Sequence, residues 1–539
     1  MRMRQWILAA LLAGACAGSR AQDVPYQRIV RADREPQSWL TYGGNYQSQR
    51  FSRLAQVNRG NVAQLRVAWI YQPVRPVANL ESVPIVADGV MYITEPPSTV
   101  TALDVRTGLR LWSWSPVLPK HIVSIGLYAT SRGVAILGHT VYIGTADAHL
   151  VALDAKTGAV RWNVPVADNK MGYAITGPPL AINGKILIGT GGSEAAVRGL
   201  LDAYDAKTGR RLWRLWTVPR VGESGADTWG PGAAQSAGGT TWNNGSYDPE
   251  LNLVYWGTGN PAPDFNDDDR PGDNLYTCSL LAIDPDTGKM KWYFQFSPHE
   301  NHDWDSAEPP VLLDAVIAGK PRKLVVLANR NAFYYVLDRL TGKFITGVPF
   351  ARETWAKGLD ANGRPILEPN QQPTLGAGTL VYPSITGAVD WSSPSYSPIT
   401  GLFYVSTHET GAYYIKGTGK IEQGGQGPRG IVGGGGIRAL AGEQSYGAIR
   451  ALEATTGKRK WQFRLLSPAW VGTLATAGGL VFSGSDEGNF FALDAETGKP
   501  LWNFYMGHEI RSNPITYELD GKQYVFETAG NAYVAFTLP

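Results

Sequence analysis

The chain has little cysteine and little net charge. Its 539 residues contain 2 cysteines, and Cys16 lies in an N-terminal leader, so only Cys278 remains after cleavage and no intrachain disulfide can form. It has no Cys-x-x-Cys-His motif, which excludes covalently attached haem. Lysine plus arginine number 49 against 46 acidic residues, and the excess lies in the leader at Arg2, Arg4 and Arg20. Binding to nucleic acid or acidic lipid through a basic surface therefore has no support.

Residues 1–21 are predicted to be a secretory signal peptide. Two arginines precede an apolar run from Trp6 to Cys16, and Ser19-Arg20-Ala21 supplies small residues at the cleavage positions. The run is short for a bilayer span, and Ala13-Gly14-Ala15 is a poor match to a lipoprotein signal. We therefore expect an exported protein without a membrane span after cleavage, in which residues 22–539 form a single domain.

One phrase recurs along the chain: Ala-Leu-Asp, two variable residues, Thr-Gly, three variable residues and Trp. The copies begin at Ala102, Ala152, Ala203, Ala282, Ala451 and Ala492, with degenerate copies at Val336 and Ser395. Each copy predicts a β-hairpin whose turn is made by Asp and Thr-Gly. Four short strands per repeat are typical of propeller blades. We predict an all-β, eight-bladed β-propeller with tryptophan-docking repeats; seven blades with long insertions are the alternative.

The segment from Gly417 to Gly447 is rich in glycine and includes four consecutive glycines from Gly433. We expect a mobile surface loop there. A phosphate-binding loop would need a following helix, and no helical pattern follows. A nucleotide site in this segment is therefore rejected.

Five segments between the repeats carry a family resemblance. They are GTGGSEAAVRG from Gly189, GGTTWNNGSYDPELNLVYWGTGNPAP from Gly238, HDWDSA from His302, NRNAFYYVLDR from Asn329 and AWVGTLATAGGLVF from Ala469. In this order they resemble the quinoprotein alcohol dehydrogenases, the family that includes methanol and ethanol dehydrogenases. The resemblance runs from about Trp39 to the C-terminus. It implies an eight-bladed propeller with pyrroloquinoline quinone (PQQ) and a metal ion on its axis.

The resemblance places the metal ligands on Glu194, Asn260 and Asp305. Carboxylate and amide oxygens suit a hard cation such as Ca²⁺. It also makes Asp305 the catalytic base, because an alcohol must lose its hydroxyl proton as hydride leaves its carbon. Asp303 is the competitor for that role, two residues away. Lanthanide-using relatives carry an acidic residue where this chain has Ala307, so calcium is favoured over a lanthanide.

The same resemblance assigns contacts with PQQ. The cofactor-binding residues it implies are Glu81, Arg132, Thr176, Gly192, Ser193, Trp242, Arg330, Asp390 and Trp470. Trp242 is expected to lie flat against the cofactor's ring system. Arg330 is expected to act in catalysis with Asp305, because its positive charge would stabilise the oxygen that becomes negative when the quinone is reduced.

The chain departs from the family pattern at several positions. Gly126-Leu127 stands where many relatives have two adjacent, disulfide-bonded cysteines. Asp390 replaces an asparagine, and we expect it to be paired with Arg330 or with the metal, or to be protonated. Asp264 replaces an aromatic residue that helps to wall a small apolar pocket in methanol-type enzymes. We therefore expect a more open or polar pocket and an alcohol larger than methanol.

The function predicted from these residues is oxidation of an alcohol by a periplasmic enzyme that depends on PQQ and calcium. Because the chain has no haem motif, its electrons would pass to a separate cytochrome c or another soluble carrier. Two alternatives remain open: a non-catalytic propeller that scaffolds envelope proteins, and a degenerate homologue that binds PQQ without turnover. The scaffold alternative predicts that Glu194, Asn260, Asp305 and Arg330 do not converge on the axis.

Overall fold

The computed structural model describes residues 23–73, 80–120, 122, 130–235, 237–418, 435–440, 442 and 444–539. The predicted signal peptide, Gly126-Leu127 and residues 419–434 of the glycine-rich segment lie outside these ranges. The structure is 44% strand and 5% helix, which confirms the all-β prediction.

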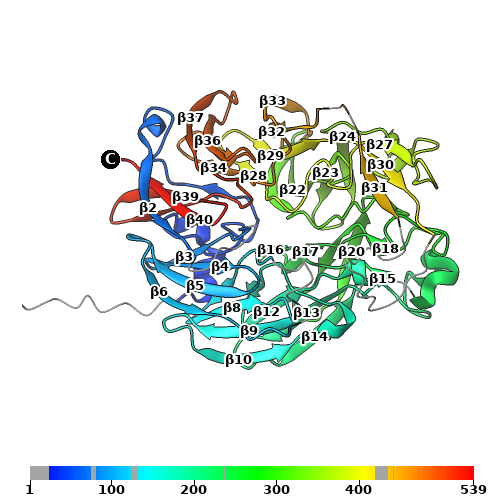
Figure 1. Ribbon diagram of the computed structural model, residues 1–539, viewed down its shortest axis with the longest axis horizontal. Coiled ribbons are helices and arrows are strands. Elements are labelled where there is room, and N and C mark those ends of the chain that lie inside the picture. The colour runs from blue at the N-terminus through cyan, green and yellow to red at the C-terminus, as the bar shows by residue number, and fades with distance from the viewer. Residues whose placement is uncertain are drawn as a thin grey trace, which may run out of the picture.

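Within the described residues, eight sheets of four or five strands follow one another around a ring, mostly in chain order (Figure 1). The first four sheets are β3 (Ile85–Ala87), β4 (Val90–Glu95), β5 (Thr99–Asp104) and β6 (Arg110–Trp114); β7 (Ala135–Leu137), β8 (Thr140–Gly144), β9 (His149–Asp154) and β10 (Val160–Pro165); β11 (Leu180–Ile182), β12 (Lys185–Gly189), β13 (Leu200–Asp205) and β14 (Arg211–Trp216); and β16 (Ser246–Asp248), β17 (Leu253–Gly257), β19 (Ser279–Ile283) and β20 (Met290–Gln295). The other four are β21 (Val311–Ile317), β22 (Lys320–Ala328), β23 (Phe333–Asp338) and β24 (Phe344–Pro349); β28 (Ser395–Ser397), β29 (Leu402–Glu409), β32 (Tyr446–Glu453) and β33 (Arg459–Arg464); β1 (Phe51–Ser52), β34 (Leu474–Thr476), β35 (Leu480–Gly484), β36 (Asn489–Asp494) and β37 (Pro500–Tyr505); and β2 (Arg66–Tyr71), β38 (Ile515–Leu519), β39 (Lys522–Ala529) and β40 (Ala532–Thr537).

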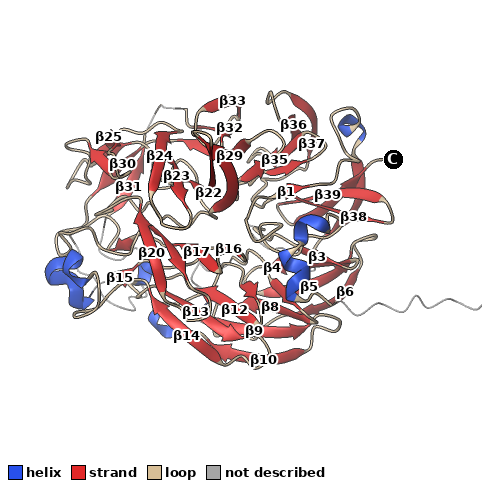
Figure 2. Ribbon diagram, turned by 180° about the vertical axis from the view of Figure 1, so that it is seen from behind, coloured by secondary structure: helices blue, strands red, loops and turns tan. Residues whose placement is uncertain are grey.

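Smaller elements lie between or beside these sheets, and the few helical turns stand out in Figure 2. The short strands are β15 (Ala237–Gly238) with β18 (Pro261–Ala262), β25 (Ala356–Leu359) with β26 (Pro365–Leu367), and β27 (Thr379–Val381) with β30 (Ala412–Ile415) and β31 (Gly436–Ala439). The helical segments are α1 (Tyr26–Val30) and 3₁₀ turns at Ala32–Arg34, Val62–Gln64, Asn169–Met171, Ser193–Ala195 and Ala226–Gln235.

The ring is closed by strands from opposite ends of the sequence. Strand β2 pairs antiparallel with β40, with Arg66 opposite Thr537 and Tyr71 opposite Tyr533. Figure 1 shows this as a blue strand beside red strands. Strand β1 also joins a late sheet, by parallel pairing with β34. The last two sheets of the ring are therefore each built from both ends of the chain.

The repeated phrase has a clear physical basis in its turn. Asp154 Oδ1 accepts hydrogen bonds from the backbone N–H groups of Lys156 at 3.0 Å and Thr157 at 2.9 Å. Gly158 follows with φ +74°, a left-handed conformation that glycine adopts without strain. A Cβ on Gly158 would lie 2.6 Å from the indole of Trp112 in the preceding sheet. The turn therefore needs glycine both for its backbone angle and for the close approach of a neighbouring tryptophan.

Four repeat tryptophans, and Trp69 outside the repeated phrase, contact the next sheet along the ring. Five indole N–H groups donate to backbone carbonyls there, at donor–acceptor distances of 2.9 to 3.2 Å. The pairs are Trp69 with Val105, Trp112 with Ala155, Trp162 with Ala206, Trp213 with Pro285 and Trp461 with Ala495. The Trp292 indole N–H has no such partner among the described residues, although its ring packs on Gly342 in the same way.

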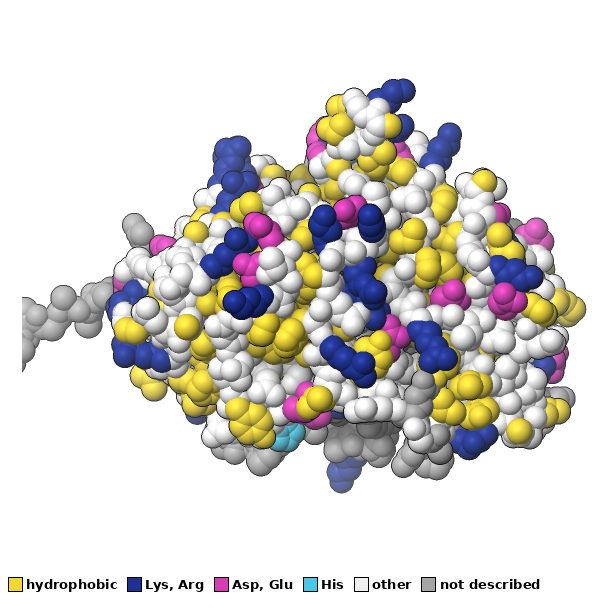
Figure 3. Space-filling model, turned by 90° about the horizontal axis from the view of Figure 1, so that it is seen from above, with side chains coloured by type: hydrophobic (Ala, Val, Ile, Leu, Met, Phe, Trp, Pro, Cys, Tyr) yellow, Lys and Arg dark blue, Asp and Glu magenta, His cyan; other side chains and the backbone are white. Residues whose placement is uncertain are grey.

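Burial falls from the inner strands to the outer strands of each sheet. In the second sheet β8 is buried throughout, whereas β10 alternates between exposed and half-buried residues. Acidic and basic side chains are interspersed on the face shown in Figure 3. No helix within the described ranges is long and apolar enough to cross a membrane.

Candidate active site

The predicted cofactor and metal residues surround one cavity of about 330 Å³. All twelve line it: Glu81, Arg132, Thr176, Gly192, Ser193, Glu194, Trp242, Asn260, Asp305, Arg330, Asp390 and Trp470. Each lies in a loop that precedes the first strand of a sheet or follows its second strand, as Asp305 precedes β21 and Glu194 follows β12. In an antiparallel sheet these two kinds of loop emerge at the same end. Loops from many sheets can therefore meet around one cavity.

Six further residues complete the lining: Thr130, Gly191, Thr240, Asp303, Trp391 and Arg511. Sequence reasoning did not place them in the site, and it treated Asp303 only as a competitor for the role of Asp305. Trp391 could have been found from its position directly after Asp390. Nothing in the sequence around Arg511 pointed to the cavity.

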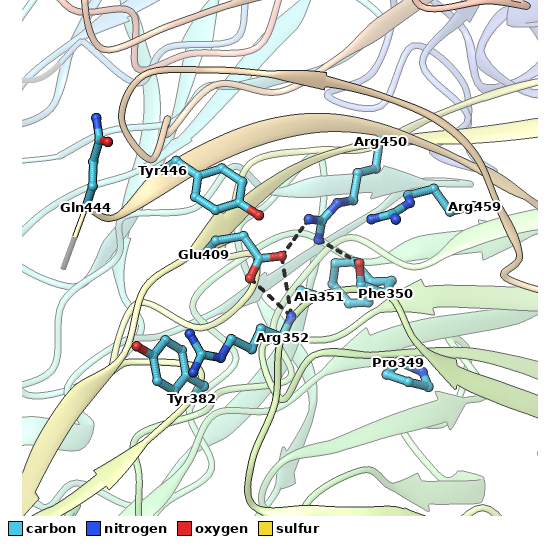
Figure 4. A pocket seen from close by; sticks show the side chains of 10 residues that line it. All are labelled: Pro349, Phe350, Ala351, Arg352, Tyr382, Glu409, Gln444, Tyr446, Arg450 and Arg459. Carbon is cyan, nitrogen blue, oxygen red and sulfur yellow. Dashed lines mark hydrogen bonds and ion pairs between the residues drawn. The ribbon is translucent and has the colours of Figure 1, made fainter.

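A larger cavity of about 490 Å³ lies beside β24, β29 and β32, and contains none of the predicted residues (Figure 4). Its central carboxylate, Glu409, accepts a hydrogen bond from Arg450 Nη2 at 2.5 Å and another from the backbone N–H of Arg352. Arg450 also donates to the carbonyl of Phe350 at 2.7 Å. These contacts join neighbouring sheets through charges that are already paired, so the smaller cavity is the stronger candidate.

Asp305 is fixed by three donors. Its Oδ1 accepts from the backbone N–H of Asn260 at 2.6 Å, and its Oδ2 accepts from Trp242 Nε1 at 2.8 Å and Arg330 Nη1 at 3.1 Å. Burial raises the pKa of Asp305 above its ordinary value, and Arg330 opposes that rise. A buried carboxylate with a raised pKa is suited to accept a proton from a bound substrate.

Arg330 lies among three carboxylates. Its guanidinium nitrogens are 3.1 Å from Asp305, 3.8 Å from Asp390 and 4.0 Å from Asp303. Burial would lower its pKa, but these carboxylates, Asp390 first, raise it above the ordinary value. The ion pair between Asp390 and Arg330, one of the arrangements predicted from the sequence, is therefore present at a long distance of 3.8 Å. The role of Asp390 toward a cofactor stays a prediction.

Arg132 brings a second guanidinium to the cavity. It pairs with Glu81 at 2.8 Å and donates to Thr176 Oγ1 at 3.0 Å. Its Cζ lies 5.0 Å from the ring centroid of Trp242 and 4.9 Å from that of Trp391, within range of cation–π attraction. Its Nε is buried and has no hydrogen-bond partner among the described residues. This arrangement leaves donor capacity for an anionic group in the cavity.

Glu194 is carried by the short turn Ser193–Ala195. Gly192 before it has φ +121°, and a Cβ there would lie 2.5 Å from the carbonyl oxygen of Gly172. Ser193 is anchored by a 2.9 Å hydrogen bond between its Oγ and Thr240 Oγ1. The local backbone therefore admits only glycine before the turn, and holds Glu194 at the cavity.

The candidate metal ligands are oxygen donors in a carboxylate-rich region. Burial raises the pKa of Glu194 to about 7, and nearby Asp264 and Asp305 add to the rise. No group of three or more His, Cys, Asp or Glu side chains is assembled for a metal within the described part of the chain. Asn260 completes the predicted set with an amide. The donor set therefore fits a hard cation, because such an ion would relieve the repulsion between these carboxylates.

Asp264 does not line the cavity, although its place in the sequence suggested a pocket wall. Its side chain is 5% exposed, it is absent from the cavity lining, and its Oδ1 accepts from Asn260 Nδ2 at 2.7 Å. The replacement of an aromatic residue by Asp264 therefore places a buried carboxylate behind Asn260. The size of the substrate stays a prediction.

Comparison with known proteins places the site in a family context. Residues 39–362 match the family described as "Glucose/ethanol/alcohol dehydrogenase, beta-propeller domain". Residues 445–538 match the family described as "Outer membrane protein assembly factor BamB". The first match covers more than half of the chain and contains ten of the twelve predicted residues; Asp390 and Trp470 lie beyond it.

Individual relatives cover almost the whole chain. The quinoprotein alcohol dehydrogenase PedH of Pseudomonas putida is 38% identical over 97% of this chain and 90% of the relative. The solved quinohemoprotein alcohol dehydrogenase from Comamonas testosteroni is 35% identical with a TM-score of 0.89, over 96% of this chain and 82% of that one. A europium-containing methanol dehydrogenase structure is 32% identical with the same TM-score of 0.89, over 95% of this chain and 100% of that one.

Proposed function

Because the chain belongs to the quinoprotein alcohol dehydrogenases and is a PQQ-dependent alcohol oxidoreductase, we propose that it oxidises an alcohol larger than methanol to an aldehyde or ketone, using PQQ and Ca²⁺ in the axial cavity. The observation that carries this proposal is the convergence of Glu194, Asn260, Asp305 and Arg330 on one cavity. The scaffold alternative predicted that these side chains would lie apart.

The residues present fit PQQ, a planar tricyclic quinone with three carboxylates. A volume of about 330 Å³ lies within the range of small-ligand sites. Arg132 and Arg330 each have a buried Nε without a hydrogen-bond partner in the described ranges, and guanidinium groups suit carboxylates. Trp242 and Trp470 add aromatic surface for a planar ring.

Each side chain then has a part in the reaction. PQQ supplies the hydride acceptor, and a bound cation would polarise its carbonyl as a Lewis acid. Asp305 accepts the hydroxyl proton of the alcohol at its carboxylate, while Trp242 and Asn260 hold that carboxylate in place. Arg330 keeps Asp305 ionised until the proton arrives, and its positive charge favours negative charge that develops on a nearby oxygen.

We propose Ca²⁺ as the cation, held by Glu194, Asn260 and Asp305. The alanine at position 307 leaves out a carboxylate that lanthanide-using relatives carry, which supports a divalent ion. Turnover measured with CaCl₂ and with LaCl₃ tests this choice. Much greater activity with lanthanum would overturn it.

We further propose that the enzyme works in the periplasm and passes electrons to a separate cytochrome c or another soluble carrier. The predicted signal peptide and the missing haem motif support this. We also propose that the eight sheets are eight propeller blades docked by the repeat tryptophans. The indole hydrogen bonds between neighbouring sheets support that interpretation.

The decisive experiment is dye-linked alcohol oxidation by the purified apo-protein, with PQQ and CaCl₂ each added or withheld. A panel from methanol to bulky secondary alcohols is offered. Activity that requires both additions, and that is greater on a larger alcohol than on methanol, is the expected result. Bound PQQ without turnover of any alcohol would favour the degenerate homologue, and absence of PQQ binding would favour the scaffold.

A further inference from the structure

The side-chain amide of Asn260 is held in one orientation. Its Nδ2 donates to Asp264 Oδ1 at 2.7 Å and to the carbonyl of Pro261 at 3.3 Å. Its backbone N–H donates to Asp305 Oδ1 at 2.6 Å. Both hydrogens of the amide nitrogen therefore have acceptors behind the residue. The side-chain oxygen is the polar atom left for the cavity that Asn260 lines.

Asp264 decides this orientation because a carboxylate accepts hydrogen bonds and cannot donate them. If the Asn260 amide were reversed, its oxygen would face the Asp264 carboxylate and its NH₂ group would face the cavity. Oxygen against carboxylate is repulsive, and an NH₂ group does not bind a cation. The neutral carbonyl of Pro261 alone would oppose the reversed amide much less strongly.

The loop that carries Asp264 is itself braced. Strand β18 before it pairs with β15, with Pro261 opposite Gly238. Arg270 is buried and donates to the carbonyl of Pro263 at 2.9 Å. Phe265 is buried after Asp264, in the same apolar cluster as strands β19 and β22. Asp264 therefore has a fixed position from which to hold its neighbour.

Asp264 has no direct contact with the cavity. It is 5% exposed and does not line the space in which substrate and cofactor would bind. Within the described ranges, the Asn260 amide is the side chain that donates a hydrogen bond to it. Burying a carboxylate with a single neutral donor is costly. Its hydrogen bond with Asn260 is thus the direct contact between Asp264 and the site, beside the repulsion through space by which Asp264 adds to the raised pKa of Glu194.

We propose that Asp264 is a positioning residue that orients the Asn260 amide so that its oxygen binds the cation of the cavity. This inference rests on the proposed cation site of Glu194, Asn260 and Asp305. Groups that hydrogen-bond to metal ligands typically strengthen metal binding 10- to 100-fold. Asp264 acts through Asn260, so its effect is on cation affinity and not on a proton transfer.

The test measures calcium binding directly, by titration calorimetry of CaCl₂ into the full chain saturated with PQQ. Asp264→Leu removes the acceptor and is expected to weaken calcium binding by about 10- to 100-fold. Asp264→Asn keeps an acceptor oxygen without the charge and is expected to bind calcium more tightly than Asp264→Leu. The matched control is Asp268→Asn in the same loop, where an exposed carboxylate pairs with Lys416 at 2.5 Å. Its calcium affinity is expected to equal that of the wild type.

The outcomes separate this inference from the proposed function. If the wild-type chain binds no calcium, the proposed cation site fails and the inference fails with it. If the wild type binds calcium and Glu194→Gln does not, but Asp264→Leu binds as well as the wild type, only the positioning role is overturned. Equal weakening in Asp264→Asn and Asp264→Leu would show that charge and not orientation matters, which also overturns it. Should Asp264→Leu fail to fold, Asp264→Ser replaces it with the same expectation, because its hydroxyl is too short to reach Asn260 Nδ2.

Discussion

Replacing Arg330 by methionine is expected to destabilise the apo-protein in a pH-dependent way. The guanidinium is buried and lies within 4.0 Å of Asp303, Asp305 and Asp390. Removing one partner of a buried ion pair usually costs about 3–5 kcal/mol, because the remaining charge is left uncompensated. Three carboxylates lose a shared cation here, so we expect a loss near the upper end of that range at pH 8.

The pH dependence follows from the direction of the carboxylate pKa values. Burial raises the pKa of both Asp303 and Asp305, and Arg330 opposes the rise in each. Without Arg330 these pKa values rise further above those of the unfolded chain. A carboxylate whose pKa is higher in the folded state than in the unfolded state destabilises the fold at pH values above its unfolded-state pKa. This destabilisation disappears as the pH falls and the carboxylate becomes protonated. The destabilisation by Arg330→Met is therefore expected to be smaller at pH 5.5 than at pH 8.

Urea unfolding of the apo-protein at both pH values measures this difference. Arg339→Met is the matched control, because Arg339 is also buried and pairs with Asp248 at 2.7 Å, but it lies outside the cavity. The Arg339→Met variant is expected to lose stability but to bind PQQ as tightly as the wild type. An Arg330→Met variant that loses the same stability at pH 5.5 and pH 8 would refute the electrostatic argument.

Three further predictions follow from the site and the repeats. Asp305→Asn is expected to retain PQQ binding but to lose about 10²- to 10⁴-fold in turnover, the usual contribution of a general base; unchanged turnover would exclude Asp305 from that role. Gly158→Ala is expected to destabilise by more than Gly184→Ala in thermal unfolding, because both have positive φ but only the first would clash with an indole. Hydrogen bonding to Asp267 raises the pKa of His299, so His299→Gln is expected to lower the melting temperature at pH 5.5 more than at pH 8, since the ion pair is lost as pH rises through the raised pKa; equal losses would contradict this.

The repeated elements were predictable because their sequence signal is local. The Asp154 turn, Gly158 and Trp112 each follow from a short phrase whose hydrogen bonds close within a few residues or onto the next sheet. Alternating apolar residues then located the strands between the phrases. The all-β class can therefore be predicted from the sequence alone.

The candidate site was predictable for a different reason. Residues as far apart as Glu81 and Trp470 could be brought together only through the family resemblance, since no spacing along the chain indicates that they share a cavity. The orientation of Asp264 could not be predicted from the family resemblance. Its position suggested a pocket wall, but the side chain turns behind Asn260, and such a direction depends on the packing of a loop. Arg511 was missed because no motif surrounds it.

The pairing of β2 with β40 determines when the site can exist during biosynthesis. The cavity takes side chains from Glu81 near one end of the chain to Arg511 near the other, and the ring that gathers them closes through residues up to Thr537. The chain must therefore be synthesised as far as Thr537 before the last sheet can form. If PQQ and a cation bind in this cavity as proposed, their insertion follows that step and is a late event in the maturation of the enzyme.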